Sequence, residues 1–198
     1  MVAELIAGFG DVTVAEAAGV VLAIAYLALA IRQNILCWFA AFASSLLYMV
    51  VFFSARLYME SALQIFYAAM AVYGYVQWKY GGAEHAGVEI ATWTVDQHAL
   101  TLGVIVILSA SLGWLMSRTD AAFPFVDSFT TVSAIVATFM VARKILENWL
   151  YWFVIDGISV FIYLARGLEL TAALFIVYLV LIVVGFRRWW LDLRAQRL

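Results

Sequence analysis

Charged residues divide this sequence into apolar segments of similar length. A membrane helix needs about 20 mostly apolar residues to cross a hydrocarbon core about 30 Å thick, and each segment comes close to that length. Runs such as Leu170–Val184 are apolar on every side, which favours helices over the alternating pattern of a membrane β-barrel. The pattern predicts seven transmembrane helices, over Val14–Ile31, Ile35–Phe53, Glu60–Trp78, His98–Met116, Phe125–Val141, Ile145–Leu164 and Leu170–Phe186.

Composition restricts the class of protein. Of the 198 residues, 67% are hydrophobic and 12% are charged, whereas a soluble domain averages about 45–50% apolar and about 25% charged residues. The longest polar interval, Lys79–Gln97, has the length of a loop and leaves no room for a soluble catalytic domain. The net charge of −2 argues against a nucleic-acid partner, which requires a basic face. We therefore expect a single transmembrane domain over residues 1–198.

The basic residues predict the orientation of the chain, because cytoplasmic loops are enriched in Lys and Arg. Seven helices place the two ends of the chain on opposite sides, and no basic residue precedes the first predicted helix. A cytoplasmic C-terminus assigns eight of the 11 basic residues to the inside, namely Arg32, Lys79, Arg143, Lys144, Arg187, Arg188, Arg194 and Arg197. Arg56, Arg118 and Arg166 then lie outside with the N-terminus.

The chain also resembles itself at an offset of 111 residues. Residues 14–78 and 125–189 share 14 identical positions in this gap-free register. The pairs least explained by hydrophobicity are Trp38 and Trp149, Tyr67 and Tyr178, Gly74 and Gly185, and Trp78 and Trp189. The register predicts a parallel 3+1+3 repeat, with repeat one at about 14–79, a connector helix at about 98–117 and repeat two at about 125–190. This symmetry occurs in secondary transporters with a site near the midplane; a duplicated bundle without transport is the alternative.

One predicted helix concentrates polar and aromatic side chains. At about 100° per residue, five residues of the sixth helix fall within an arc of about 80°: Asn148, Trp152, Asp156, Ser159 and Tyr163. Their counterparts in the second helix are Cys37, Ala41, Ser45, Tyr48 and Phe52. The second repeat thus has an amide, an indole and a carboxylate where the first has smaller or less polar groups.

Asp156 is the only acidic residue near the centre of a predicted helix. A charged carboxylate there costs about 2.5–3.5 kcal/mol on insertion scales. It either contacts a substrate from a wet cavity or bonds a neighbouring helix, and Asn148 either binds substrate or bonds the backbone near the start of its helix. Trp152 lies deeper than the other tryptophans, which favours stacking on a ligand.

Further candidates lie in the second and third predicted helices. Gln64 shares a face with Tyr67, and a Gln within the membrane requires hydrogen-bond partners. Tryptophans near helix ends are typical of membrane interfaces, whereas His85 and His98 indicate solvated positions. The candidate substrate site comprises Asn148, Trp152, Asp156, Gln64, Tyr67, Trp38, Ser45, Tyr48, Ser159 and Tyr163.

Several chemistries lack sequence support. The chain has no phosphate-binding loop, no H-E-x-x-H and no G-x-S-x-G motif, so we expect neither catalytic residues nor a metal or other cofactor. Side chains such as Trp, Tyr, Asn and Gln with one Asp suit a neutral or cationic aromatic ligand that carries hydroxyl groups.

The run Glu147-Asn148-Trp149-Leu150-Tyr151-Trp152, an N-W-x-x-W pattern, is followed by Asp156 and by Tyr163-x-x-x-Gly167-Leu168-x-x-Thr171-Ala172. With Gln64-Ile65-Phe66-Tyr67 and Tyr73-Gly74-Tyr75-x-Gln77-Trp78, it resembles the Pnu family of vitamin transporters, most of all the nicotinamide riboside branch. The resemblance covers nearly the whole chain.

The resemblance implies an all-α SWEET-like 3+1+3 fold in the bacterial inner membrane, commonly trimeric. It implies facilitated diffusion of nicotinamide riboside, which is trapped in the cytoplasm by phosphorylation, with Asn148 and Trp152 holding the substrate. Transport of thiamine or another vitamin, and a membrane binding or sensor protein without transport, remain alternatives.

Overall fold

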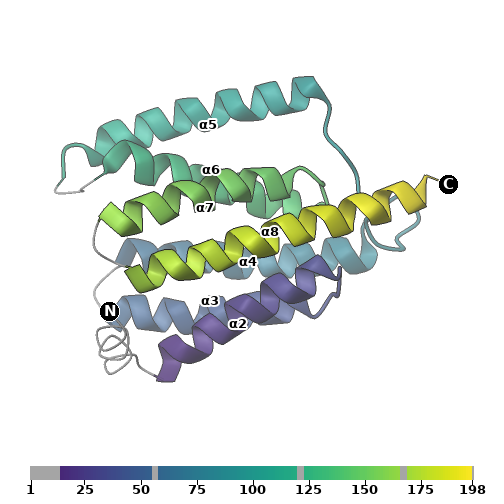
Figure 1. Cartoon of the computed structure of the whole chain (residues 1–198), viewed down its shortest axis with the longest axis horizontal. Coiled ribbons are helices and arrows are strands. Elements are labelled where there is room, and N and C mark those ends of the chain that lie inside the picture. Colours follow the sequence, from purple (N-terminus) through teal and green to yellow (C-terminus); the bar gives the residue numbers. More distant parts are fainter. Residues whose placement is uncertain (1–13, 55–57, 120–122, 166–168, 198) are drawn as a thin grey trace. The chain divides into compact units, whose positions relative to one another are not determined.

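The computed structural model describes residues 14–54, 58–119, 123–165 and 169–197 (Figure 1). The helices within these ranges are α2 (Val14–Ile31), α3 (Cys37–Ser54), α4 (Tyr58–Tyr80), α5 (Val95–Met116), α6 (Pro124–Ala142), α7 (Asn148–Ala165) and α8 (Glu169–Gln196). Each coincides with a predicted segment, so the all-helical prediction is confirmed. The N-terminal segment, Arg56 and Arg166, which bear on the predicted orientation, lie outside the described residues.

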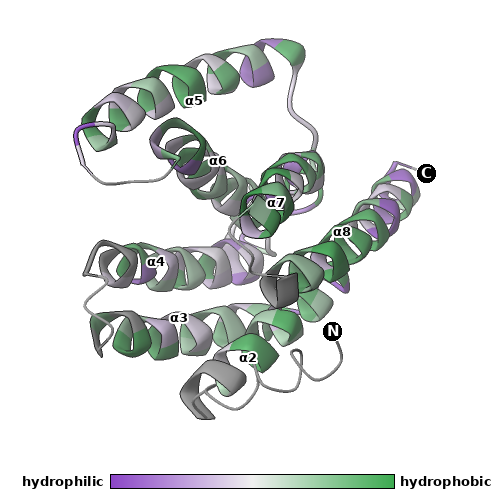
Figure 2. Ribbon diagram, turned by 60° about the vertical axis from the view of Figure 1, so that its left-hand side comes forward, coloured by the Kyte–Doolittle hydropathy of each residue, from purple (hydrophilic) through white to green (hydrophobic). Residues whose placement is uncertain are grey.

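Helix α8 continues well beyond its predicted end at Phe186, as far as Gln196. Figure 2 shows its hydrophilic residues gathered toward the C-terminal end. The extension is stabilised because Trp189 and Leu193 are buried, and because the Arg194 guanidinium lies 3.7 Å from the centre of the Trp190 ring. The predicted end at Phe186 was too early, because charged side chains can cover apolar surface with their stems and need not end a helix.

Four helices among the described residues are long and apolar enough to cross a membrane: α5, α6, α7 and the Ala172–Gln196 part of α8. Shorter apolar stretches lie in α2 and α3, over Ala18–Ile31 and Cys37–Val51. Helix α4 has comparable length but carries tyrosines, glutamines and charged residues, which lower its hydropathy. Figure 2 accordingly shows hydrophobic residues along most of the helices. The protein is a multi-pass membrane protein.

The chain divides into two compact units. Unit one comprises Met1–Glu89 and Arg187–Trp189, and unit two comprises Ile90–Phe186 and Trp190–Leu198. In unit one, α3 packs against both α2 and α4. In unit two, α6 packs against both α5 and α7. In each unit, one helix therefore packs against two others.

Tryptophans at the predicted helix ends are buried within unit one rather than exposed at a membrane interface. The Trp38 ring lies directly against Gly74, where an added Cβ would overlap it. The ring of Trp78 meets Trp38 edge-on at 5.4 Å between centroids. The Trp189 indole donates a hydrogen bond of 3.1 Å to the Ala30 carbonyl oxygen. The interfacial prediction was wrong because these rings fill the interior between helices.

Unit two contains the same kind of contact. The Trp149 ring lies against Gly185, where a Cβ would approach it to 2.6 Å. Trp149 is 2% exposed, as is Trp38. In both units a glycine therefore provides the space for a buried indole.

The α2–α3 and α6–α7 connections have matching backbones. Gln33 has φ 52° and Lys144 has φ 50°, a left-handed conformation that is uncommon outside glycine. The next residue in each connection donates a 2.9 Å hydrogen bond to a carbonyl oxygen five residues earlier, Asn34 to Leu29 and Ile145 to Met140. Equivalent positions are 111 residues apart in the sequence, which is the offset of the predicted repeat.

Candidate functional site

Asn148 begins helix α7 and is fully buried, with an exposed fraction of 0%. Its side-chain Nδ2 donates a 2.6 Å hydrogen bond to the Ile145 carbonyl oxygen. The Oδ1 atom is buried and has no hydrogen-bond partner among the described residues. The side-chain amide thus bonds the backbone, which was one of the two predicted roles of Asn148, and its Oδ1 atom can still accept a hydrogen bond. A buried acceptor without a partner costs about 1–3 kcal/mol, so a donor from a ligand would be stabilising.

Trp152 lies one turn further along α7 and is half-buried. It packs, together with Tyr151, on a cluster formed by Ala134 and Ala137 of α6 and Ile155 of α7. The small alanine side chains allow the indole to lie close to α6. Because the rest of the ring stays accessible, Trp152 can present an aromatic surface for stacking.

The polar and aromatic residues that share one face of α7, here called the polar stripe, are Asn148, Trp152, Asp156, Ser159 and Tyr163. The last three differ in the contacts that their side chains already make. Asp156 is buried, with 5% of its surface exposed. The Ser159 hydroxyl donates a 2.9 Å hydrogen bond to the Ile155 carbonyl oxygen. The Tyr163 ring lies 5.0 Å from the Phe175 ring, between centroids. Asp156 is therefore the one acidic residue of this group, and its side chain has little exposure to water.

Five other predicted site residues belong to unit one. Trp38 and Ser45 of α3 are buried, and the ring of Tyr48 lies close to Gly19 of α2. Gln64 and Tyr67 of α4 are half-buried. Within unit one, the two packed helices α3 and α4 thus supply a hydroxyl, an amide, phenols and an indole.

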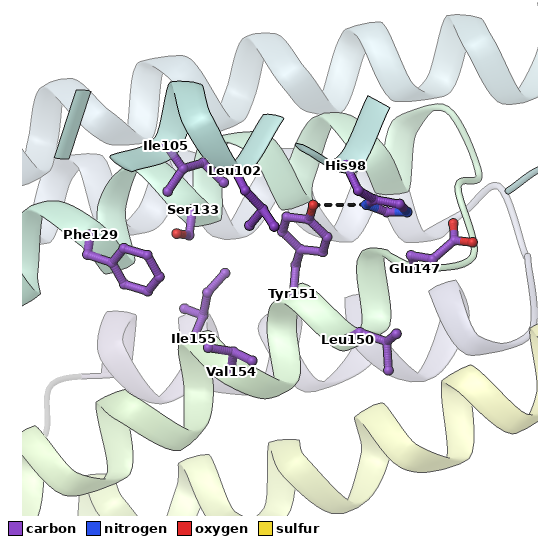
Figure 3. Close-up of a pocket in the computed structure, with 10 residues that line it drawn as sticks. All are labelled: His98, Leu102, Ile105, Phe129, Ser133, Glu147, Leu150, Tyr151, Val154 and Ile155. Carbon is purple, nitrogen blue, oxygen red and sulfur yellow. Dashed lines mark hydrogen bonds between the residues drawn. The ribbon is translucent and has the colours of Figure 1, made fainter. Parts of the chain in front are cut away.

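A pocket of about 330 Å³ lies between α5, α6 and α7 in unit two (Figure 3). Its lining is mainly apolar and includes none of the predicted site residues: His98, Leu102, Ile105, Phe129, Ser133, Glu147, Leu150, Tyr151, Val154 and Ile155. The α7 residues of this lining lie on the face next to the polar stripe. Helix α7 therefore contributes to two different surfaces.

Polar groups gather at one end of this pocket. The His98 Nδ1 and Tyr151 hydroxyl are 3.0 Å apart in a hydrogen bond, and the two rings stack at 5.9 Å (Figure 3). The Trp93 amide donates a 3.3 Å hydrogen bond to Glu147 Oε2. Nearby, Ala91 forms an isolated parallel bridge with Ile145. The segment before α5 is thus bonded to the start of α7.

His98, which was predicted to begin the fourth helix at a solvated position, is therefore not a fully solvated residue. It lies in the first turns of α5 and is partly buried. The missed signal is a capping box: the Thr94 hydroxyl accepts from the Gln97 amide, and the Gln97 side chain accepts from the Thr94 amide. The S/T-x-x-E/Q spacing of such a box begins a helix before His98.

No group of three His, Cys, Asp or Glu side chains that could hold a metal ion occurs among the described residues. The candidate site instead provides an amide, a carboxylate, hydroxyls and aromatic rings. These groups can bind a polar aromatic molecule.

Comparison with known proteins gives a family. Residues 13–191 match the family model described as nicotinamide mononucleotide transporter. The nicotinamide riboside transporter PnuC of Escherichia coli (strain K12) is 28% identical over 92% of this chain and 87% of its own length. The riboflavin/roseoflavin transporter RibM of Streptomyces davaonensis is 27% identical over 90% of this chain and 85% of its own length.

A solved structure shares the fold. The crystal structure of the vitamin B3 transporter PnuC superposes with a TM-score of 0.75 and 20% identity, covering 97% of this chain and 87% of that chain. Because the family model spans nearly all of the described helices, this chain belongs to the nicotinamide mononucleotide transporter family and is a membrane transporter rather than an enzyme.

Proposed function

We propose that this protein carries nicotinamide riboside across the bacterial inner membrane by facilitated diffusion. The observation that carries the proposal is the buried Asn148 Oδ1, which has no hydrogen-bond partner in the described part of the chain and lies one turn from the half-buried Trp152. The ligand has a flat pyridinium ring with a carboxamide whose N–H groups suit such an acceptor. Relatives named as nicotinamide riboside transporters align over most of the chain and support this choice.

Each stripe residue has a chemical role in this proposal. Trp152 stacks on the cationic ring, Asn148 accepts from the carboxamide, and Asp156 offsets the positive charge. Ser159 and Tyr163 lie further along the same helix. Gln64, Tyr67, Trp38, Ser45 and Tyr48 of unit one stay predicted substrate-binding residues, since amides, hydroxyls and phenols hydrogen-bond ribose hydroxyls.

The proposal includes an architecture. We infer one membrane domain over residues 1–198, in which repeats at about 14–79 and 125–190 flank a connector helix at about 98–117, the parallel 3+1+3 order of SWEET-like proteins. The similar φ angles of Gln33 and Lys144 and the Trp–Gly contacts in both units support the repeat. The N-terminus is placed outside, the C-terminus in the cytoplasm, and the assembly is a homotrimer by family resemblance.

Riboflavin is the second candidate substrate, because the riboflavin/roseoflavin transporter is almost as similar as the nicotinamide riboside transporter. Thiamine, another cationic aromatic vitamin, is a third. A membrane sensor that binds without transport is the alternative of a different class. These candidates differ in which labelled vitamin crosses the bilayer.

The test is uptake into proteoliposomes that contain the purified full chain. Labelled nicotinamide riboside should enter faster than into protein-free liposomes, and unlabelled riboside should compete better than riboflavin or thiamine. Stronger competition by riboflavin would assign the second candidate. Binding of the riboside without any uptake would support the sensor and contradict transport.

A further inference from the structure

The pocket between α5, α6 and α7 has the apolar lining that a binding site for a hydrocarbon chain requires. Leu102, Ile105, Phe129 and Val154 provide apolar surface from all three helices (Figure 3). These helices are each long and apolar enough to cross a membrane, so the wall belongs to the membrane-spanning part of unit two. The volume of about 330 Å³ lies at the low end for ligand sites, which suits one chain rather than a whole lipid.

Ser133 provides a polar position within this apolar wall. Its residue is 3% exposed, and its Oγ has no hydrogen-bond partner among the described residues. Other hydroxyls of these helices donate to the carbonyl oxygen four residues earlier, namely those of Ser111, Ser128, Thr138 and Ser159. The Ser133 hydroxyl is not used in this way, although the bond would satisfy it. It lines the pocket, where a ligand oxygen could accept from it.

The other polar groups lie at the end of the pocket where α5 and α7 begin. Glu147 precedes α7 and supplies a carboxylate, of which Oε2 accepts from the Trp93 amide. His98 and Tyr151 share a hydrogen bond, and each side chain has a second hydrogen-bonding position. Arg143 and Lys144 belong to the same connection but do not line the pocket. This end of the pocket therefore carries a carboxylate group, with the hydrogen-bonding side chains of His98 and Tyr151 beside it.

We propose that this pocket binds one acyl chain of a phospholipid whose head group carries a primary ammonium, as in phosphatidylethanolamine. The ammonium lies at Glu147, and a phosphate oxygen accepts from the His98–Tyr151 pair. An ester carbonyl oxygen accepts from Ser133, and the chain continues along Ile105 and Phe129. The lipid joins the start of α7, which carries Asn148 and Trp152, to the connector helix α5.

The experiment uses the full chain in nanodiscs with photoreactive phosphatidylethanolamine, which bears a diazirine in one acyl chain, and separately with phosphatidylglycerol of the same chains. After illumination, labelled peptides are mapped by mass spectrometry. The ethanolamine lipid should label the α5 and α7 peptides around Leu102 and Val154 at least threefold more than the glycerol lipid.

Variants separate this site from the general lipid shell. Val154→Trp and Leu102→Trp fill the pocket from different helices, and either should reduce labelling at least threefold. Glu147→Gln should remove the preference between the two lipids, and Ser133→Ala should weaken labelling. Thr138→Ala, on the same helix but outside the lining, and Glu89→Gln, an exposed acid, are the matched controls. Thermal melting verifies that each variant is folded.

Two results would overturn the proposal. Equal labelling by the two lipids, or labelling of exposed α8 residues such as Val180 as strong as that of the pocket, would leave no specific site.

Discussion

Trp152 and Asn148 lie one helical turn apart on α7. Asn148 is buried, and Trp152 packs against a buried cluster of α6 and α7 side chains. Trp152→Ala should weaken nicotinamide riboside binding by about 1–3 kcal/mol, as loss of an aromatic platform does for stacked bases. This corresponds to roughly a 5- to 150-fold rise in Kd. Trp152→Phe should retain part of the affinity. Titration calorimetry measures both, with the exposed Trp114→Ala as the control.

Asn148→Ala tests the amide separately from the ring. The substitution should weaken binding of nicotinamide riboside more than that of an analogue without the carboxamide, because only the first ligand loses a buried partner. Wild-type affinity in both Asn148→Ala and Trp152→Ala would move the site away from α7.

Glycine positions give a stability prediction at the same scale. Gly74→Ala should destabilise the protein by about 1–3 kcal/mol, since its Cβ would overlap the buried Trp38 ring. Gly157→Ala is the matched control, because nothing lies within 4 Å of its Cβ and alanine favours a helix by up to about 1 kcal/mol. Melting temperatures in detergent should therefore shift in opposite directions. Equal shifts would contradict the packing role of Gly74.

Helical elements were largely predictable from the sequence, because apolar runs between charged residues have the length of a membrane span. The end of α8 was not, since burial of Trp189 depends on the Ala30 carbonyl far away in the sequence. The Trp38–Gly74 contact could not be predicted from the hydrophobic pattern either, because the two residues lie far apart in the sequence. The stripe residues of α7 followed from helical periodicity. The pocket required the packing of three helices, and only the capping box before His98 pointed toward it.

The two matching connections make a prediction about topology. If α2–α3 and α6–α7 are equivalent parts of a parallel repeat, Arg32 and Arg143 lie on the same, cytoplasmic side. Both residues are exposed. In a Cys37→Ala background, which removes the single cysteine, Arg32→Cys and Arg143→Cys should react with an impermeant maleimide only after permeabilisation. Arg118→Cys should react in intact cells, and labelling of Arg32 and Arg143 from opposite sides would exclude the repeat.

For the whole molecule, we predict passive transport. Asp156 is the only acid near the centre of a predicted span, and no second charged residue lies near the centre of a span to form a proton relay with it. Proteoliposomes should equilibrate the riboside without ATP or an ion gradient. Accumulation above the external concentration under an imposed proton or sodium gradient, with no trapping enzyme present, would contradict this mechanism.

The buried indoles of unit one have an optical consequence. Trp38 and Trp78 have centroids 5.4 Å apart, and Trp78 and Trp189 have centroids 6.1 Å apart. Rings held this close at fixed angles couple their electronic transitions, and near-ultraviolet circular dichroism reports such fixed packing and disappears with it, even where helices persist. The near-ultraviolet circular dichroism of the protein should therefore include a contribution from these three rings, which is lost when the side chains of unit one lose their fixed packing and which needs no attached label.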